Sequence, residues 1–267
     1  MLWEELTSIK FEEAVKNCGG VCILPIGVLE KHGQHLPLGT DMMAVNAVCK
    51  AAAEQESAIV FPYYFFGQIS EARQCPGTIS VSSRMQMESL LAMCDEIARN
   101  GLKKIIIMSG HGGNHHFLPY FAQEMPRLDR DYSVYTGYAS DLSNEQINII
   151  AETAGTRDFG YHAGLTETAL MLHVRSDLVD MDAQTPEEGQ RLGRLSAIEE
   201  SRLYTGFNWY ANYPHHFAGD HTKSTKELGA MIFDMKVENI VKAIRAVKAD
   251  NVSGELTREF AERSRNH

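Results

Sequence analysis

The 267-residue sequence has no run of about 18 apolar residues, the length that a helix needs to cross a bilayer. Its N-terminal segment lacks the basic and then apolar pattern of a secretory signal peptide. Positive charge is also scarce, because 25 Lys and Arg stand against 35 Asp and Glu and give a formal net charge of −10. This excess of acids argues against nucleic acid or an anionic membrane as the main partner. We therefore expect a soluble, cytoplasmic protein with no nucleic-acid and no membrane partner.

Cysteine and tryptophan are few. The five cysteines are scattered, odd in number and without a CxxC pair, which favours reduced thiols in a cytoplasm over a disulfide framework. The two tryptophans are Trp3 and Trp209.

Apolar runs alternate with helical patterns along the chain. With 44% hydrophobic and 22% charged residues, the chain has enough apolar material for a substantial core. No repeat, linker or composition shift marks a second domain, so we expect one domain over residues 1–267, with a polar tail at about 251–267. The alternation predicts an α/β fold: a doubly wound, mostly parallel sheet with helices on both faces. The expected strands cover residues 21–26, 58–62, 104–108 and 132–138, and the main expected helices cover 4–16, 42–55, 83–100, 145–154, 165–174, 187–203 and 224–248.

Polar side chains that could hold a metal follow the first expected strand. Glu30, His32, His35 and Asp41 all come shortly after the apolar run 21–26. Glu30 and His32 are two residues apart, so in extended backbone both side chains leave the same face. Carboxylates and imidazoles at the end of a buried strand can bind a divalent metal ion, although a polar surface loop has a similar composition.

Two later segments carry further candidates. SGHGGN, residues 109–114, follows the expected strand 104–108, and its glycines would let the backbone approach a ligand while His111 offers a metal ligand. A phosphate-binding turn or a plain tight turn is the alternative, but the Walker GK[ST] ending and the GxGxxG pattern are absent. In the third segment, His162 precedes a helix whose first turn contains Glu167. Taken alone, Glu167 would complement the helix dipole, and His162 would be a satisfied loop residue.

Together the three segments resemble the creatininase family of metal-dependent amidohydrolases. The resemblance rests on LPIGVLEKHGQHLPLGTD at residues 24–41, SGHGGN at 109–114 and HAGLTETALML at 162–172. It implies a doubly wound α/β fold, two divalent metal ions per chain and hydrolysis of a C–N amide bond, often in a cyclic substrate. It also implies a homo-oligomer, commonly a hexamer, and a small-molecule amide as substrate.

Transferred position by position, the resemblance assigns the metal ligands. Glu30, His32, Asp41 and His111 match the family's ligands, with Asp41 as the expected bridge between two metals. The namesake enzyme has a glutamate ligand where this chain has Gly113, so we expect Glu167 to supply the missing carboxylate.

The resemblance also assigns residues to the reaction and the substrate. His162 matches the family's proton-moving histidine, and Glu167 stands beside it as the second catalytic candidate. Asp158 occupies a position where the namesake closes a tryptophan over its substrate, which makes creatinine itself doubtful. The substrate candidates are Gly112, Gly113, Asn114 and Asp158, the first three through backbone amides that could stabilise an oxyanion.

The expected reaction is therefore attack on an amide carbon by a hydroxide held between two metal ions. The substrate would be a cyclic, creatinine-like amide or a formamide, rather than a peptide. Imidazole and carboxylate ligands without thiolate suit zinc, manganese or iron and do not choose between them. Two alternatives remain open at this point: a metal-dependent phosphoester hydrolase, and a non-catalytic metal-binding protein whose second site has decayed at Gly113.

Overall fold

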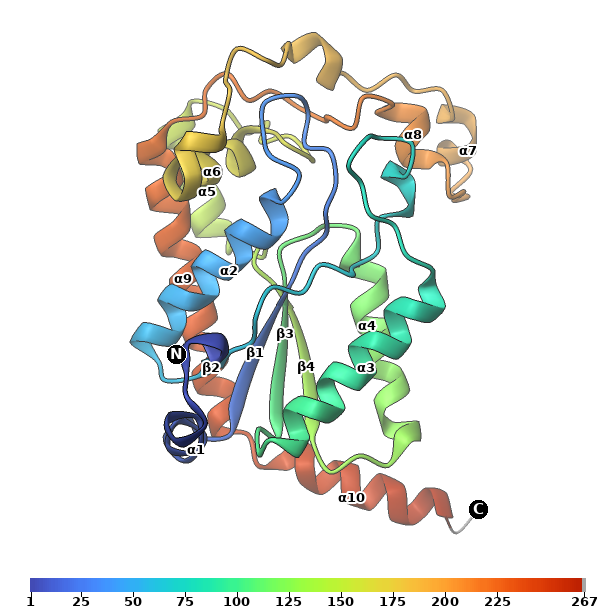
Figure 1. Cartoon of the computed structure of the whole chain (residues 1–267). Helices are drawn as coiled ribbons and strands as arrows, with labels where there is room; N and C mark the ends of the chain where they lie inside the picture. Colours follow the sequence, from blue (N-terminus) through green and yellow to red (C-terminus); the bar gives the residue numbers. More distant parts are fainter. Residues whose placement is uncertain (266–267) are drawn as a thin grey trace.

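The computed structural model describes residues 1–265 and contains one parallel sheet in the strand order β2-β1-β3-β4 (Figure 1). β1 (Val21–Ile26) pairs along its whole length with β3 (Lys104–Ser109), and β3 pairs in the same way with β4 (Ser133–Tyr138). β2 (Ile59–Val60) forms the edge beside β1. The strands at the centre of the sheet are therefore the two that precede the candidate ligand turns.

Helices cover both faces of this sheet. β1 is buried at every residue, and its successive side chains enter two different cores, with Leu24 in one and Ile23 in the other. The helices over the first core are α1 (Ser8–Asn17), α3 (Ser83–Arg99) and α4 (Asn114–Glu124). The helices over the second core are α2 (Thr40–Gln55) and α9 (Lys226–Ala249). The predicted doubly wound α/β fold is confirmed.

Two further helices extend the second face. α5 (Asn144–Ala154) and α6 (Leu165–Arg175) share a small core with α9. α6 and α9 approach so closely that a Cβ on Gly229 would lie 1.8 Å from the carbonyl oxygen of Ala169. This contact fixes the position of α6, whose first turn carries Glu167.

The rest of the described chain contains short or peripheral helices. The remaining α-helices are α7 (Ser196–Glu200), α8 (Asn208–Asn212) and α10 (Val252–Arg265). The 3-10 helices span Trp3–Glu5, Ser70–Ala72, Met125–Leu128, Ser176–Leu178 and Pro186–Gly189.

Four expected elements differ from those observed. The expected helix at 4–16 is the 3-10 helix Trp3–Glu5 followed by α1, which begins at Ser8 after the N-cap Thr7. The second strand is two residues long instead of five, because the chain leaves the sheet at Phe61. The expected helix at 187–203 is a 3-10 turn followed by α7, with Gly193 between them at a φ of 65° that helices do not use. The described part of the expected polar tail is helix α10, which packs against β4 and the 3-10 helix Met125–Leu128 and buries Ala261, and residues 266–267 lie outside the described residues.

The strand order places a switch point between β1 and β3. α2 leads from β1 to β2 over one face, and α4 leads from β3 to β4 over the other, so the chain leaves the adjoining strands β1 and β3 in opposite directions (Figure 1). In open α/β sheets the crevice beyond the carboxyl ends of such strands is where ligands bind. Residues 27–39 after β1 and residues 110–113 after β3 border this crevice.

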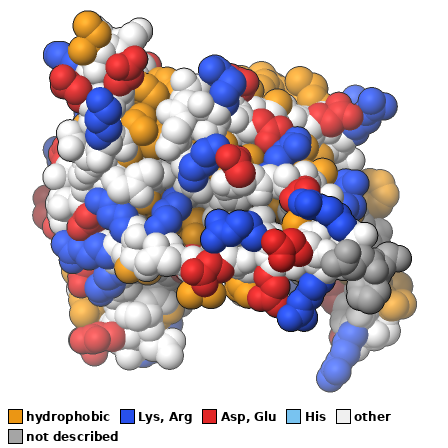
Figure 2. All heavy atoms as spheres, turned by 90° about the horizontal axis from the view of Figure 1, so that it is seen from below, with side chains coloured by type: hydrophobic (Ala, Val, Ile, Leu, Met, Phe, Trp, Pro, Cys, Tyr) orange, Lys and Arg blue, Asp and Glu red, His pale blue; other side chains and the backbone are white. Residues whose placement is uncertain are grey.

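The opposite end of the molecule carries mixed charge. Figure 2 shows that on this face Lys and Arg side chains alternate with Asp and Glu. Ion pairs near the starts of the strands include Lys103 with Asp131 and Lys248 with Glu56. Among residues 1–265, no helix combines the length and apolar character needed to cross a membrane. The five cysteines are all buried and free.

Candidate metal centre

The ligand candidates meet at the switch point because two glycines allow the backbone to close there. A Cβ on Gly110, directly after β3, would lie 2.6 Å from the carbonyl oxygen of Asp41. A Cβ on Gly27, directly after β1, would lie 2.7 Å from the amide nitrogen of Met42. Without these side chains, the first turn of α2 lies against the ends of both strands, which brings Asp41 to the loops after β1 and β3.

Four side chains from these segments form a buried cluster. Glu30, His32, Asp41 and His111 are each no more than 7% exposed. Nε2 of His32 lies 3.1 Å from Oδ1 of Asp41, and Nδ1 of His111 lies 2.8 Å from Oε1 of Glu30 and 3.1 Å from Oδ2 of Asp41. Four predicted residues of the first two segments are thus brought together, whereas His35 is in none of the ligand groups and its Nε2 lies 2.9 Å from Oγ1 of Thr168.

Asp41 belongs to two groups of possible ligands. Glu30, Asp41 and His111 each place one ligand atom within 4.8 Å of the others, and so do His32, Asp41 and Glu167. Each group offers both oxygen and nitrogen donors, which suits divalent transition metals. Asp41 is therefore placed to contribute to both groups. A third group, formed by Glu30, His32 and His162, shares one residue with each of these two.

Backbone carbonyls fix which nitrogen of each histidine is free. Nδ1 of His32 lies 3.2 Å from the carbonyl oxygen of Glu30, and Nε2 of His111 lies 2.7 Å from the carbonyl oxygen of Gln68. These nitrogens donate to the carbonyls, so in the neutral rings the other nitrogen presents a lone pair to carboxylate oxygens. Oε1 of Glu30 and Oδ2 of Asp41 are buried and accept no hydrogen bond from the described residues. Lone pairs facing unpartnered carboxylate oxygens fit a cation placed between them.

The pKa values of these side chains in the metal-free protein agree with a cation site between the carboxylates. Burial alone would lower the pKa of His32, but the Asp41 carboxylate raises it to about 10. Burial is likewise outweighed at His111, whose pKa the Glu30 and Asp41 carboxylates hold well above its ordinary value. At Glu30, burial is outweighed by the neighbouring imidazoles, chiefly His111, and the pKa lies well below the usual range. The carboxylates therefore attract positive charge into the cluster, as added protons or as metal ions.

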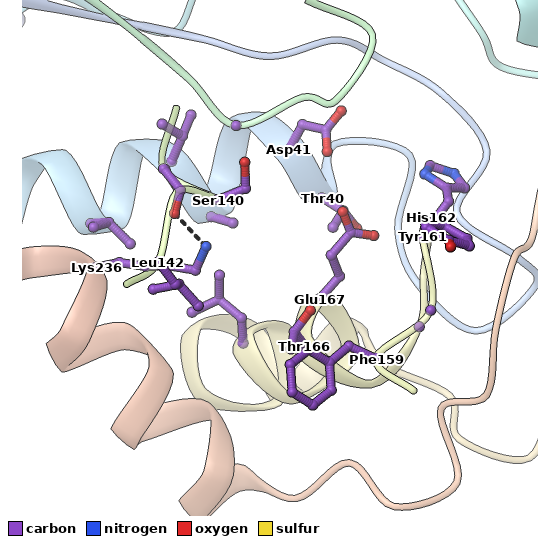
Figure 3. Close-up of a pocket in the computed structure, with 18 of the residues that line it drawn as sticks. Thr40, Asp41, Ser140, Leu142, Phe159, Tyr161, His162, Thr166, Glu167 and Lys236 are labelled. Atoms are coloured by element: carbon purple, nitrogen blue, oxygen red, sulfur yellow. Dashed lines mark hydrogen bonds between the residues drawn. The ribbon is translucent and has the colours of Figure 1, made fainter. Parts of the chain in front are cut away.

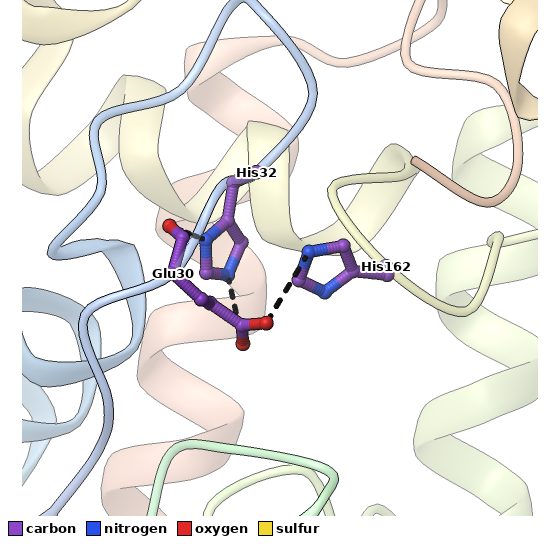
Figure 4. A group of neighbouring side chains, drawn as sticks. All are labelled: Glu30, His32 and His162. Carbon is purple, nitrogen blue, oxygen red and sulfur yellow. Dashed lines mark hydrogen bonds and ion pairs between the residues drawn. The ribbon is translucent and has the colours of Figure 1, made fainter. Parts of the chain in front are cut away.

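His162 lies at the edge of the same cluster (Figure 4). Its ring centroid is 4.3 Å from that of His32, and its Nε2 donates to the carbonyl oxygen of Lys31 at 2.8 Å. Nδ1 is then the unprotonated atom of the neutral ring. Burial lowers the pKa of His162 well below its ordinary value, so the ring is neutral at pH 7. A neutral imidazole with a free nitrogen can accept or relay a proton.

His216 is a neighbour of the cluster that the motifs do not contain. Its Nε2 lies 2.5 Å from Oε2 of Glu30, and its Nδ1 accepts the indole N–H of Trp209 at 2.9 Å. Because Nδ1 is an acceptor, Nε2 carries the proton and donates to the glutamate. Trp209, His216 and Glu30 thus form a buried chain that fixes the orientation of the carboxylate.

The family profile described as "Creatininase: Creatinine amidohydrolase" matches residues 4–244 of this sequence. The chain belongs to the creatininase family.

The chain is also similar to individual proteins that are named by their activity. The creatinine amidohydrolase of Pseudomonas putida is 30% identical over 191 residues, which cover 67% of this chain and 73% of that protein. The mycofactocin precursor peptide peptidase of Mycolicibacterium smegmatis is 30% identical over 250 residues, 88% of each chain. A mutant creatininase solved in a Zn-Zn form aligns with a TM-score of 0.72 and 26% identity, over 93% of this chain and 98% of that one. The protein is therefore a metal-dependent hydrolase of the creatininase family.

At position 113, where the namesake of the creatininase family has a glutamate, this chain has no space for a side chain. A Cβ there would lie 2.4 Å from Nε2 of His111 and 2.7 Å from Oε1 of Gln68. Gln68 therefore occupies the space that a larger residue at position 113 would need. The second ligand group contains the carboxylates of Asp41 and Glu167, and Oε2 of Glu167 accepts the amide of Ala163 at 2.6 Å.

Two other substrate candidates, Asn114 and Asp158, have side chains that hydrogen-bond within the protein. The side chain of Asn114 is buried, accepts the amide of Gln68 and donates to Ser109, so it holds the ends of two loops together. Asp158 is exposed and accepts the amide of Gly160. The substrate roles of Gly112, Gly113, Asn114 and Asp158 stay predictions.

A cavity of about 300 Å³ opens beside the ligands (Figure 3). Asp41, His162 and Glu167 lie at one end of it, so a molecule inside the cavity would contact the cluster. Gly110 lines it, whereas the four predicted substrate residues, all within the described chain, do not.

Proposed function

We propose that this protein is an amidohydrolase that cleaves a C–N amide bond in a small molecule at a centre of two divalent metal ions. The observation that carries the proposal is the sharing of Asp41 by two ligand groups, one with Glu30 and His111 and one with His32 and Glu167. The similarity to a creatinine amidohydrolase and to a precursor peptide peptidase supports amide cleavage as the reaction. When bound, the metal ions would supply Lewis acidity and a nucleophilic water at neutral pH.

Side chains of this protein would bind the metals and transfer the proton. Glu30, His32, Asp41, His111 and Glu167 would hold the metals. Nδ1 of His162 would take a proton in the cavity and pass it to the departing nitrogen, since this ring is neutral and its other nitrogen is committed to the carbonyl of Lys31.

The apolar lining of the cavity would shield the amide from bulk water. Leu142, Phe159 and Leu170 line it together with the polar end near Glu167. A volume of about 300 Å³ suits a small amide such as a lactam, a formamide or the end of a short peptide. We also keep the homo-oligomer, a hexamer by resemblance, and the cytoplasmic location as proposals.

Metal removal and reloading test the function. The protein would be stripped with a chelator, reloaded with zinc, manganese or iron, and assayed on lactams, formamides and short peptides. We expect no turnover in the stripped protein and turnover of at least one amide class after reloading. Reloaded protein that binds metal and cleaves no amide of the panel would contradict the proposal.

A further inference from the structure

The cavity beside the ligand cluster has a second polar end. Lys236, on α9, lines it across the cavity from Glu167 (Figure 3). Among the lining residues, all of them in the described part of the chain, Lys236 is the one lysine or arginine. The cavity thus has carboxylates and imidazoles at one end and a single cation at the other.

Lys236 is half-buried as a residue, and few groups compensate the charge of its ammonium. It donates one hydrogen bond, to the carbonyl oxygen of Ala139 at 2.5 Å, and within residues 1–265 no carboxylate lies close enough to form an ion pair with it. An ammonium has three protons to donate, so this group keeps donors for a ligand. Burial lowers the pKa of Lys236 to about 8, which still leaves it charged at pH 7.

The walls between the two ends are apolar. Val45 and Val48 of α2, Leu142, Ile147 and Phe159 contribute to them. A ligand that fills this space would therefore be amphipathic, with a short apolar part between two polar ends.

We propose that the substrate carries a carboxylate that Lys236 binds, while the amide to be cleaved lies at the ligand cluster. This inference rests on the proposed function and names the substrate class: a small amide with an anionic end separated from the scissile bond by a short apolar linker. Lys236 is then a specificity-determining residue.

The charges around Lys236 favour a carboxylate over a phosphate. A single lysine supplies one positive charge, and the acidic group of Asp141, which is not among the proposed metal ligands, acts on the same ammonium. A dianion would meet this negative field with only one cation to offset it. A monoanion matches the site better.

A purely structural role is the alternative. Lys236 could serve only to satisfy the carbonyl of Ala139 at the end of β4, or to support Glu167 through the field of its charge. Neither role would make binding depend on an anionic group in the ligand, and this difference decides the experiment.

The test uses hydroxamates, which chelate divalent metal ions, on zinc-loaded protein. Each probe carries a chain that ends either in a carboxylate or in the neutral, isosteric primary amide, over a short series of chain lengths. Affinities would be measured by calorimetry for wild type, Lys236→Met and Lys236→Arg, with Lys242→Met on the exposed side of α9 as the matched control. A further probe that ends in a phosphonate tests whether the site prefers a phosphate-like dianion to a carboxylate.

At the best chain length we expect wild type to bind the carboxylate probe at least about tenfold more tightly than the amide probe, as one charge-assisted hydrogen bond would give. Lys236→Met should lose this ratio without changing the affinity for the amide probe, Lys236→Arg should keep most of it, and the control should match wild type. Equal affinities in wild type, a ratio that persists in Lys236→Met, or equal weakening of both probes by that substitution would each overturn the inference. A larger gain with phosphonate would overturn the choice of carboxylate.

Failure of the proposed function would look different. Reloaded protein would then cleave no amide of the panel, whether or not the probes bind to its zinc, and without a metal site neither probe would depend on added zinc. In that case butyrate against butyramide, measured on the metal-free protein by NMR titration, still tests Lys236: the butyrate preference must disappear in Lys236→Met, and an unchanged preference would overturn the inference.

Discussion

Asp41 is the residue on which both ligand groups depend, because it lies within reach of His111 on one side and of His32 on the other. Its neighbours are oriented by groups that are not themselves ligands: carbonyls of Glu30 and Gln68 for the two histidines, and His216 for Glu30. Partners of this kind set the direction of a ligand's lone pair and hence the affinity for metal.

His216→Ala tests this orientation. The substitution removes the donor to Oε2 of Glu30 and leaves that carboxylate free to rotate, so we expect zinc affinity to fall roughly 10- to 100-fold. Trp209→Phe, which keeps an aromatic ring but removes the N–H that fixes His216, should cause a smaller loss. Competition with a fluorescent zinc chelator would measure both. The exposed neighbour His215→Ala should bind zinc as wild type does, and wild-type affinity in His216→Ala would rule out the orienting role.

Part of this site could be predicted from the sequence alone. Glu30, His32, Asp41 and His111 follow two apolar runs that read as central strands, and the sequence predicts that such strands end at one rim. His216 and Lys236 meet this rim from far along the chain, 186 residues after Glu30 for His216. No local pattern marks either residue, because their positions depend on how the later loops and α9 pack over the sheet. Trp209 could have been linked to His216 only through their shared aromatic loop.

At the scale of elements, the packing of α6 against α9 positions both ends of the cavity. α6 carries Glu167 in its first turn, and α9 carries Lys236. The two helices approach through Gly229, where no side chain fits.

Gly229→Ala should therefore destabilise the fold. The new Cβ would meet the backbone carbonyl of Ala169, which cannot move as a side chain can, and we expect a loss of about 3 kcal/mol in the free energy of unfolding. Urea denaturation followed by circular dichroism would measure it. Gly254→Ala in α10, where nothing lies within 4 Å of the added Cβ, is the control and should be stabilising by about 0.5 kcal/mol. Equal stability of the two variants would show that α6 and α9 can separate at little cost.

The element predictions succeeded where periodicity was strong. The buried runs that form β1 and β3 and the long amphipathic helices α3 and α9 were recognisable from the sequence, with ends shifted by one or two residues. The segment 187–203 was not, because its charged composition resembles a helix while Gly193 adopts a left-handed conformation that interrupts it. The helical nature of residues 252–265 depends on contacts with β4 that are remote in sequence.

At the scale of the whole molecule, burial of the charged Lys236 lowers the free energy of unfolding. Its pKa is about 8 in the folded protein against an ordinary value of 10.5, so the charged form is disfavoured by folding. Below pH 8 this cost is fully present. Between about pH 8 and pH 10.5 the unfolded chain binds the proton that the folded chain has released, and the stability contributed by this group rises with pH.

Lys236→Met should accordingly be more stable than wild type at pH 7, and its advantage should shrink as the pH rises to about 10.5. Urea denaturation of the metal-free proteins across this range would measure the difference. Lys242→Met, on the exposed side of the same helix, should show no such trend. An advantage of Lys236→Met that is independent of pH would mean that the lysine is not penalised by its surroundings.

The central claim is that Asp41 joins two metal sites, and the metal content of purified, reloaded protein tests it most directly. Elemental analysis of wild type should find about two zinc ions per chain, Glu167→Gln should retain about one, and Asp41→Asn should retain almost none and show no amide hydrolysis. Asp41→Asn that keeps the metal content of wild type would contradict the account.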